Sequence, residues 1–267
     1  MIPIKHIKHL IIDMDGVLWL GDQPMPALNS FFQTLRELDI RFILATNNAS
    51  KSGDEYVAKL KKFGVDVALD EILTSPQAAA MYLAQHAPAA KIYVIGEPGL
   101  TVELQANGLQ VVNDAPQTAT HVVVGWDRTL SYAKLAEACL LIRAGAIFIG
   151  TNPDVTYPDA RGIVPGNGAT LAALRVSTGV EPLIIGKPMP EMMLQSMARM
   201  GSTPATTAVI GDRLDTDILG GINAGLTTLL VLTGVTAAAD AQAGDIRADY
   251  IYQDIDGIAS ALRQVSM

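Results

Sequence analysis

Short runs of apolar, mostly β-branched residues alternate with amphipathic stretches along nearly the whole chain. Such runs are typical of buried strands, and the stretches between them have the apolar spacing of helices that cover a sheet. The pattern therefore predicts an α/β protein built on parallel sheet. The expected strands are residues 9–13, 41–46, 91–96, 120–125, 146–151, 182–186, 207–212 and 227–232.

Helix-capping residues and breakers fit between these runs. Ser75, followed by proline, predicts the cap of one helix, and Ser131 and Gly145 are expected to bound another. Glycine and proline concentrate in residues 151–169, which we expect to form a long functional loop.

Composition narrows the class of protein. With 267 residues, 49% of them hydrophobic, the chain is expected to form two compact units, because single cores stop growing at roughly 250–300 residues. A net charge of −8 argues against non-specific nucleic-acid binding. A single cysteine, Cys139, excludes an intrachain disulfide. No signal peptide or apolar membrane segment is evident, so we expect a cytoplasmic protein without nucleic-acid or membrane partners.

Four polar motifs each follow an expected strand. They are Asp13 with Asp15, residues 46–48, Lys187, and residues 211–217. Taken singly, each has an ordinary structural explanation as a turn, a helix cap or a solvated loop residue. Ligands of open α/β sheets bind outside the carboxyl ends of the strands, so the four motifs together favour one site. Asp13 and Asp15 repel each other, and a cation is expected between them.

These motifs resemble the signatures of the haloacid dehalogenase superfamily. "DMDGVL", "ATNN", "GKP" and "GDRLDTDI" occur in that family's order. "TNNAS", "GKPMPEM" and "GDRLDTDILGGINAG" are similar to the branch that contains the NagD-like, p-nitrophenyl and pyridoxal-phosphate phosphatases, over about the whole chain. The resemblance implies a Rossmann-like, doubly wound core. It also implies a Mg²⁺-dependent phosphatase that acts on a small phosphate monoester, such as a sugar phosphate, a nucleotide or phosphoglycolate.

The same resemblance implies roles for three aspartates. The carboxylates of Asp13 and Asp212 and the backbone carbonyl of Asp15 would bind Mg²⁺, which prefers oxygen ligands. Asp13 would attack phosphorus and form an aspartyl phosphate, because positive charge nearby offsets the repulsion between two anions. Asp15 would protonate the leaving oxygen and later take a proton from water.

Other residues would hold the phosphoryl group. By resemblance, Thr46, Asn47 and Asn48 donate hydrogen bonds to its oxygens, and Lys187 adds a compact positive charge that positions both nucleophile and phosphate. Asp217 is expected to orient either Asp212 or Lys187.

Thr46 and Lys187 lie much further apart in sequence than the roughly 30 residues of a βαβ unit. The excess predicts an inserted domain at residues 84–179, with the core formed by residues 1–83 and 180–267. Family members of this type carry an α/β cap there, which excludes water and contacts the leaving group. Such caps often mediate dimers, so a homodimer through the cap is expected as one arrangement.

Substrate specificity is expected to depend on the loop at residues 151–166. Its candidate contacts are Asn152, Asp154, Tyr157 and Arg161, although the Asn and Asp are equally suited to building turns. Trp19 follows Asp15 closely and is suited either to lining the pocket or to packing beneath it.

Two alternative functions stay open at this stage. A receiver-like signalling module also combines an acidic metal site with Thr and Lys on a parallel sheet. It needs neither an acid such as Asp15 nor a large insertion, which favours the phosphatase. A phosphomutase on the same fold is the second alternative.

Overall fold

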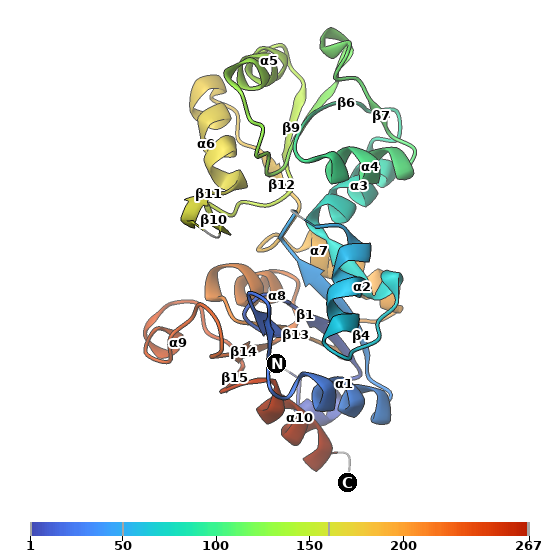
Figure 1. Ribbon diagram of the computed structural model, residues 1–267, viewed down its shortest axis with the longest axis vertical. Coiled ribbons are helices and arrows are strands. Elements are labelled where there is room, and N and C mark those ends of the chain that lie inside the picture. The colour runs from blue at the N-terminus through green and yellow to red at the C-terminus, as the bar shows by residue number, and fades with distance from the viewer. Residues whose placement is uncertain (1, 50, 160, 266–267) are drawn as a thin grey trace. The chain divides into compact units, whose positions relative to one another are not determined.

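The computed structural model describes residues 2–49, 51–159 and 161–265. Contacts within the chain divide it into two compact units, which Figure 1 shows in colours that follow the residue number. The first unit contains both ends of the chain and the second contains most of its middle. The first unit consists of Met1–Thr46, Gly53–Leu73 and Lys187–Met267, and the second of Asn47–Ser52 and Thr74–Gly186.

A six-stranded sheet with the order β15-β14-β13-β1-β4-β5 forms the core of the first unit. β1 pairs in parallel with β4 on one side and with β13 on the other. The sheet is therefore built outward from β1 in both directions, which confirms the predicted doubly wound fold, and the order reverses between β1 and β13. The strands are β1 (His9–Ile12), β4 (Arg41–Thr46), β5 (Ile72–Thr74), β13 (Thr207–Gly211), β14 (Thr227–Val231) and β15 (Tyr250–Tyr252).

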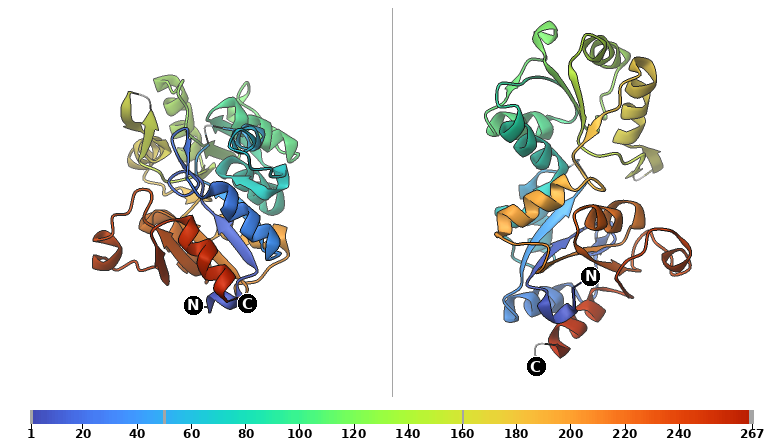
Figure 2. Two further views of the ribbon diagram at one scale, coloured as in Figure 1. Left: turned by 60° about the horizontal axis from the view of Figure 1, so that its bottom comes forward. Right: turned by 180° about the vertical axis from the view of Figure 1, so that it is seen from behind.

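Helices cover both faces of this sheet. α1 and α10 lie side by side on one face, where they pack against Leu10 and Ile12 of β1 (Figures 1 and 2). α7 contacts β1 and β4 on the opposite face (Figure 2). Leu10, Ile11 and Ile12 are each 0% exposed, so both faces of β1 are buried. The helices of this unit are α1 (Leu28–Glu37), α2 (Gly53–Lys62), α7 (Glu191–Met200), α8 (Leu219–Asn223), α9 (Asp240–Ala243) and α10 (Ile255–Gln264).

Shorter elements complete the first unit. A two-stranded antiparallel hairpin follows β1, and a π-helical turn follows β13. The π-helical turn matters because it carries Asp217, which lies against the end of β13. The short elements are the 3-10 turns Ile4–His6 and Leu69–Glu71, β2 (Trp19–Leu20), β3 (Gln23–Pro24) and the π-helical turn Leu214–Ile218.

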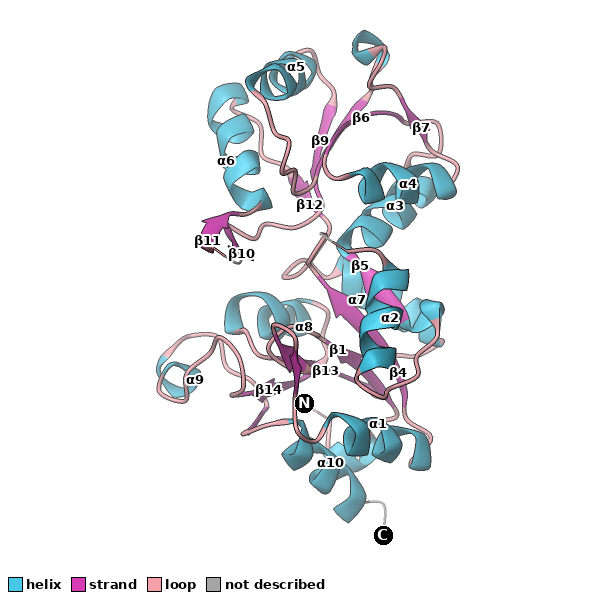
Figure 3. Cartoon of the chain, viewed as in Figure 1, coloured by secondary structure: helices cyan, strands magenta, loops and turns pink. Residues whose placement is uncertain are grey.

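The second unit has its own five-stranded sheet, in the order β12-β9-β8-β6-β7, with parallel pairing (Figure 3). Its core packs side chains of β6, β8 and β9 against α5 and α6. The strands are β6 (Lys91–Ile95), β7 (Gln110–Val111), β8 (His121–Val124), β9 (Ile147–Gly150) and β12 (Leu183–Ile184). The helices are α3 (Ser75–His86), α4 (Pro98–Ala106), α5 (Tyr132–Arg143) and α6 (Asn167–Thr178), with a 3-10 turn at Pro116–Thr118.

The second unit differs from the predicted insertion at residues 84–179. It extends from residue 74 to residue 186, because α3 packs against α4 and β12 pairs with β9. α3 also begins one residue earlier than predicted. Its cap is Thr74, whose side chain accepts a hydrogen bond from the Gln77 backbone, and Ser75 is the first helical residue.

The segment at residues 151–169 is not the long loop that its glycines and prolines suggest. It contains the antiparallel hairpin β10 (Thr156–Asp159) and β11 (Gly162–Pro165), and α6 begins at its end. Gly162, the first residue of β11, has a φ of 129°, a conformation that favours glycine.

Exposed apolar side chains occur on α5 of the second unit. Tyr132 is 86% exposed and Leu140 is 64% exposed.

Over the residues that the structure describes, the helices are too short or too polar to cross a bilayer. Formation of a homodimer through the inserted segment stays a prediction.

The end of β13 tolerates no side chain at Gly211. The π-helical turn folds back across this strand end, so a Cβ on Gly211 would overlap the Asp217 side chain. We expect Gly211→Ala to lower the free energy of unfolding by about 1–3 kcal/mol, the usual cost of overpacking. Urea denaturation measures the change.

Gly244→Ala is the matched control for this substitution. Gly244 is exposed, and the nearest atoms to an added Cβ lie 3.9 Å away. Its effect should stay within about 0.5 kcal/mol. A loss in Gly211→Ala no greater than in this control would contradict the close packing described.

Candidate active site

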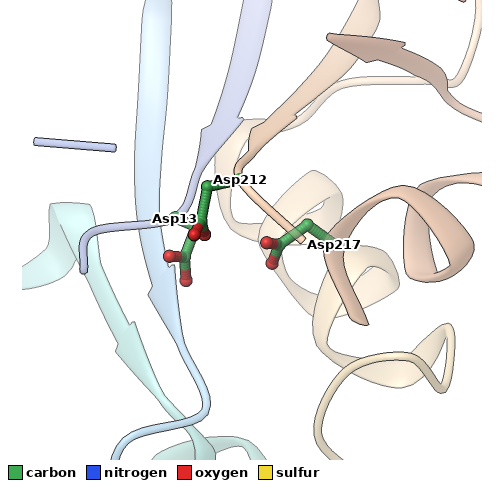
Figure 4. A group of neighbouring side chains, drawn as sticks. All are labelled: Asp13, Asp212 and Asp217. Carbon is green, nitrogen blue, oxygen red and sulfur yellow. The ribbon is translucent and has the colours of Figure 1, made fainter. Parts of the chain in front are cut away.

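The reversal of strand order brings two aspartates to one sheet edge. Ile12 is paired with Ile210, so Asp13 follows β1 beside the end of β13, and Asp212 follows β13 directly. Asp217 reaches the same place from the π-helical turn. Oxygen atoms of the three carboxylates lie within 4.8 Å of one another, and Figure 4 shows the side chains gathered there. Residues far apart in sequence thus form one acidic cluster.

Lys187 holds this cluster together. Its Nζ lies 2.5 Å from Asp13 Oδ1 and 2.6 Å from Asp217 Oδ1, and it also donates to the carbonyl of Ala45 at 3.1 Å. The Lys187 side chain is only 3% exposed. The ammonium therefore bridges two carboxylates in a site shielded from water, where charge-assisted hydrogen bonds are strong.

Both carboxylate oxygens of Asp217 accept hydrogen bonds within this cluster. Oδ1 accepts from Lys187, and Oδ2 accepts from the backbone N–H of Arg213 at 3.2 Å. The sequence left open whether Asp217 orients Asp212 or Lys187. In the structure Asp217 accepts a hydrogen bond from Lys187. Asp215, two residues earlier, is exposed and forms an ion pair with Arg213 at 2.9 Å.

A loop after β14 fixes Asp212. The backbone N–H of Val235 donates to Asp212 Oδ2 at 2.7 Å. An added Cβ on Gly234 would collide with this carboxylate, and one on Gly16, which has a φ of 85°, would come within 2.5 Å of it. Two glycines thus allow the backbone to approach Asp212 closely.

Sequence reasoning missed this loop. Its signal was present, because "TGVT" follows an expected strand and carries a glycine close to the strand end. Thr233 extends the same contact, since its hydroxyl donates to the carbonyl of Gly16 at 2.6 Å.

Burial and mutual repulsion shift the ionisation of the acids. Burial raises the pKa of the Asp13 carboxyl well above its usual range; the Lys187 ammonium opposes the rise, and the carboxylates of Asp217 and Asp212 add to it. Burial, followed by the charge of Asp217, raises the pKa of Asp212 to about 6. Burial alone would lower the pKa of Lys187, but Asp13 and Asp217 raise it above its usual value. Lys187 stays charged and cannot by itself neutralise three acids.

The donor set fits a hard divalent cation. Asp13 Oδ2 and Asp212 Oδ1 accept no hydrogen bond from any residue that the structure describes. Carboxylate oxygens are the ligands that Mg²⁺ prefers, and a cation here would relieve the repulsion that adds to the effect of burial on both pKa values. The Asp217 oxygens are taken by Lys187 and Arg213, so Asp13 and Asp212 are the better placed carboxylate ligands.

Asp15 lies two residues after Asp13 and is exposed. Its Oδ1 accepts a hydrogen bond of 2.7 Å from Trp19 Nε1. The predicted roles of its side chain as acid and base and of its carbonyl as a metal ligand stay predictions.

The predicted phosphate-binding residues lie at the end of β4 and directly after it. Thr46 ends this strand, next to β1, and is 2% exposed. Asn47 is grouped by its contacts with the second unit, where its side-chain amide donates to Asp154 Oδ1 at 3.2 Å. Asn48 is half-buried. Their binding of phosphate stays a prediction.

The four candidate specificity residues lie in the second unit in different settings. Asn152 is 4% exposed and donates to the carbonyl of Asn47 at 2.9 Å, so it supports the backbone. Asp154 accepts a hydrogen bond from the side-chain amide of Asn47. Tyr157 stacks on Trp126 with ring centroids 4.1 Å apart, and Arg161 is exposed beside the hairpin turn.

Comparison with known proteins is consistent with this geometry. Family models described as haloacid dehalogenase-like hydrolase and HAD-hydrolase-like match residues 10–110 and 184–258. The acid sugar phosphatase of Staphylococcus aureus is 37% identical over 98% of this chain and 100% of its own length.

Solved structures give the same result. A 4-nitrophenylphosphatase from Thermotoga maritima is 36% identical, with a TM-score of 0.92 over 97% of this chain and 98% of its own. A glycerol phosphate phosphatase from Mycobacterium tuberculosis in complex with magnesium is 38% identical, with a TM-score of 0.90 over 99% of this chain and 80% of its own. The chain belongs to the haloacid dehalogenase-like hydrolases, in the branch of the NagD-like and p-nitrophenyl phosphatases, and is a phosphatase of that family.

Proposed function

We propose that the protein is a Mg²⁺-dependent phosphatase that hydrolyses small-molecule phosphate monoesters through an aspartyl phosphate on Asp13. The observation that carries this proposal is the ammonium of Lys187, 2.5 Å from the Asp13 carboxylate at the switch point of the sheet. A buried carboxylate can attack an anionic ester only where positive charge offsets the repulsion. Lys187 supplies part of that charge.

Magnesium would supply the rest. The carboxylates of Asp13 and Asp212 and the backbone carbonyl of Asp15 would hold it. Bound there, Mg²⁺ neutralises charge that develops on the phosphoryl oxygens. The magnesium in the structure of the Mycobacterium tuberculosis relative supports this choice of metal.

Phosphoryl transfer to the enzyme is the first step. A carboxylate oxygen of Asp13 forms a bond to phosphorus while the bond from phosphorus to the ester oxygen breaks. Asp15 gives its proton to that oxygen, so the product leaves as an alcohol. Thr46 and Asn47 donate hydrogen bonds to the phosphoryl oxygens, and Lys187, held by Asp217, keeps Asp13 in place.

Hydrolysis of the aspartyl phosphate is the second step. Asp15, now ionised, takes a proton from water as the water oxygen bonds to phosphorus. The bond between phosphorus and the Asp13 oxygen breaks, which restores the carboxylate and releases inorganic phosphate. Asp15 is protonated again and ready for the next cycle.

The substrate class is the least constrained part of the proposal. The relatives are named for sugar phosphates, nitrophenyl phosphate and glycerol phosphate, which supports a small sugar or polyol phosphate. A phosphoacceptor module would form a long-lived phosphoprotein, and a phosphomutase would pass the phosphoryl group to a second hydroxyl. A lasting phosphoprotein with acetyl phosphate, or an isomerised sugar phosphate without released phosphate, would overturn the hydrolase proposal.

Activity should depend on Mg²⁺ and on both proposed carboxylate ligands. EDTA should remove turnover and added Mg²⁺ should restore it. Asp13→Asn, which removes the nucleophile, should lower kcat at least about 1,000-fold, because loss of a covalent nucleophile removes most of the catalysis. Asp212→Asn should raise the Mg²⁺ concentration needed for half-maximal rate.

Asp215→Asn is the matched control for charge. It removes one negative charge from the same helical turn, but its side chain is 66% exposed and paired with Arg213. Its kcat and Mg²⁺ requirement should match the wild type. Turnover of Asp13→Asn above a tenth of the wild-type rate would exclude the covalent mechanism.

Asp15→Asn should affect esters according to their leaving group. The single-turnover rate of enzyme phosphorylation should fall about 100-fold or more with glycerol phosphate, whose alkoxide needs a proton. It should fall much less with p-nitrophenyl phosphate, because nitrophenolate leaves without one. Rapid-quench assays measure both rates, and equal losses would exclude Asp15 as the acid.

Tyr157→Ala should change the ranking of substrates without stopping the chemistry. If the hairpin contacts the leaving group, kcat/KM for the best substrate should fall roughly 5- to 150-fold, while p-nitrophenyl phosphate stays within a few fold. Arg161→Ala tests the neighbouring contact in the same assay. Tyr157→Phe keeps the stacking on Trp126 and serves as the control. A uniform drop across all esters would assign the hairpin to folding or closure instead.

A further inference from the structure

Trp19 packs beneath the loop that carries Asp15 and does not line an open pocket. It is 0% exposed. The centroid of its ring lies 6.3 Å from the ring centroid of Tyr56 and 6.0 Å from that of Phe63. The Lys59 ammonium lies 4.3 Å from the indole, a cation–π contact. α2 and the residue that follows it thus fix the position of the indole ring.

The backbone of the loop is held as tightly as the ring. The N–H of Gly16 donates to the carbonyl of Trp19 at 2.8 Å, and the N–H of Leu18 donates to Met14 at 2.8 Å. Lys59 Nζ donates to the carbonyl of Gly21 at 2.7 Å, which ties the β2–β3 hairpin to α2. The indole nitrogen therefore has a defined position relative to the backbone of Asp15.

The single polar atom of the Trp19 side chain donates a hydrogen bond to Asp15. The Nε1–H can only donate, and it meets Asp15 Oδ1 at 2.7 Å, a short distance for an N–H donor to a carboxylate. Asp15 itself is exposed. Without this bond, an exposed aspartate on a loop would rotate among several staggered side-chain conformations.

We infer that Trp19 is a positioning residue that selects which oxygen of Asp15 carries the transferred proton. The inference rests on the proposed function of Asp15. Because Oδ1 accepts the indole hydrogen, the acid form carries its proton on Oδ2. Oδ2 gives that proton to the leaving oxygen in the first step and takes one from water in the second. Trp19 keeps its own proton throughout.

Removal of the donor tests this role. Trp19→Phe keeps an aromatic ring but lacks the N–H. The single-turnover phosphorylation rate with glycerol phosphate should fall about tenfold, the lower end of what loss of an orienting hydrogen bond costs at a reactive site, with KM unchanged. The rate with p-nitrophenyl phosphate should change less than threefold or so, because that ester needs no acid.

Two further variants separate positioning from packing. Phe63→Leu disturbs the same indole but keeps its N–H, so both esters should retain their wild-type ratio of rates. Site-specific replacement of Trp19 by benzothienylalanine keeps the shape of the ring and substitutes sulfur for N–H. It should reproduce the loss with glycerol phosphate even if Trp19→Phe folds poorly.

The Asp15→Asn background decides whether the two residues act together. Added to Asp15→Asn, Trp19→Phe should cause no further loss with glycerol phosphate. An equal loss for both esters in the Trp19 variants, or fully additive losses in the double mutant, would overturn the positioning role. If Asp15→Asn itself showed no dependence on the leaving group, the proposed function of Asp15 would fail instead.

A spectrum of the resting enzyme gives an independent readout. The chain has two tryptophans, so a ¹⁵N-labelled sample should show two indole N–H signals, and Trp19→Phe identifies one of them. Asp15→Ala should move the Trp19 signal upfield and speed its exchange with solvent, while the Trp126 signal stays in place. An unmoved Trp19 signal would exclude the hydrogen bond on which the inference depends.

Discussion

The active site depends on one ammonium group placed between acids that would otherwise repel each other. Lys187 lies within 2.6 Å of carboxylate oxygens of both Asp13 and Asp217, and little water reaches it. Replacing Lys187 by a neutral residue would leave two buried carboxylates without their common partner, which costs far more than loss of an exposed pair. The buried group of Lys187, Asp13 and Asp217 is therefore an arrangement of charges that serves function more than stability.

The topology of the sheet explains why these groups meet. β1 and β13 are neighbours although most of the chain separates them, and their carboxyl ends lie at the reversal of strand order. Each strand needs only to end in an aspartate for two carboxylates to converge. The glycines at 16 and 234 then let the backbone close around Asp212. Rigid sheet geometry, more than flexible loops, sets the spacing on which the chemistry depends.

Much of this arrangement could be predicted from the sequence, because it depends on local signals. Asp13 and Asp212 follow runs of apolar residues that are recognisable as buried strands, and the order of the motifs matches a known family. Lys187 follows β12 instead, an edge strand of the second unit's sheet whose two residues are exposed and half-buried. The contact from Val235 to Asp212 could not be predicted, since a backbone N–H is the same in every residue. The hydrogen bond from Trp19 to Asp15 could not be predicted for a different reason. A buried indole is usually part of a core, and the direction of its N–H depends on how α2 packs against the ring.

The position of Lys187 at the boundary between the two units has a consequence for biosynthesis. When the second unit has left the ribosome, the first still lacks β13, β14 and β15, so β1 has an unpaired edge. The second unit has a complete sheet by then and can fold while translation continues. Lys187 is synthesised directly after the second unit, but its partner Asp217 and the strands β13, β14 and β15 come later in the chain, so the first unit closes its sheet only after nearly all of the chain has been made. A stalled ribosome would therefore carry a finished inserted domain on an unfinished core.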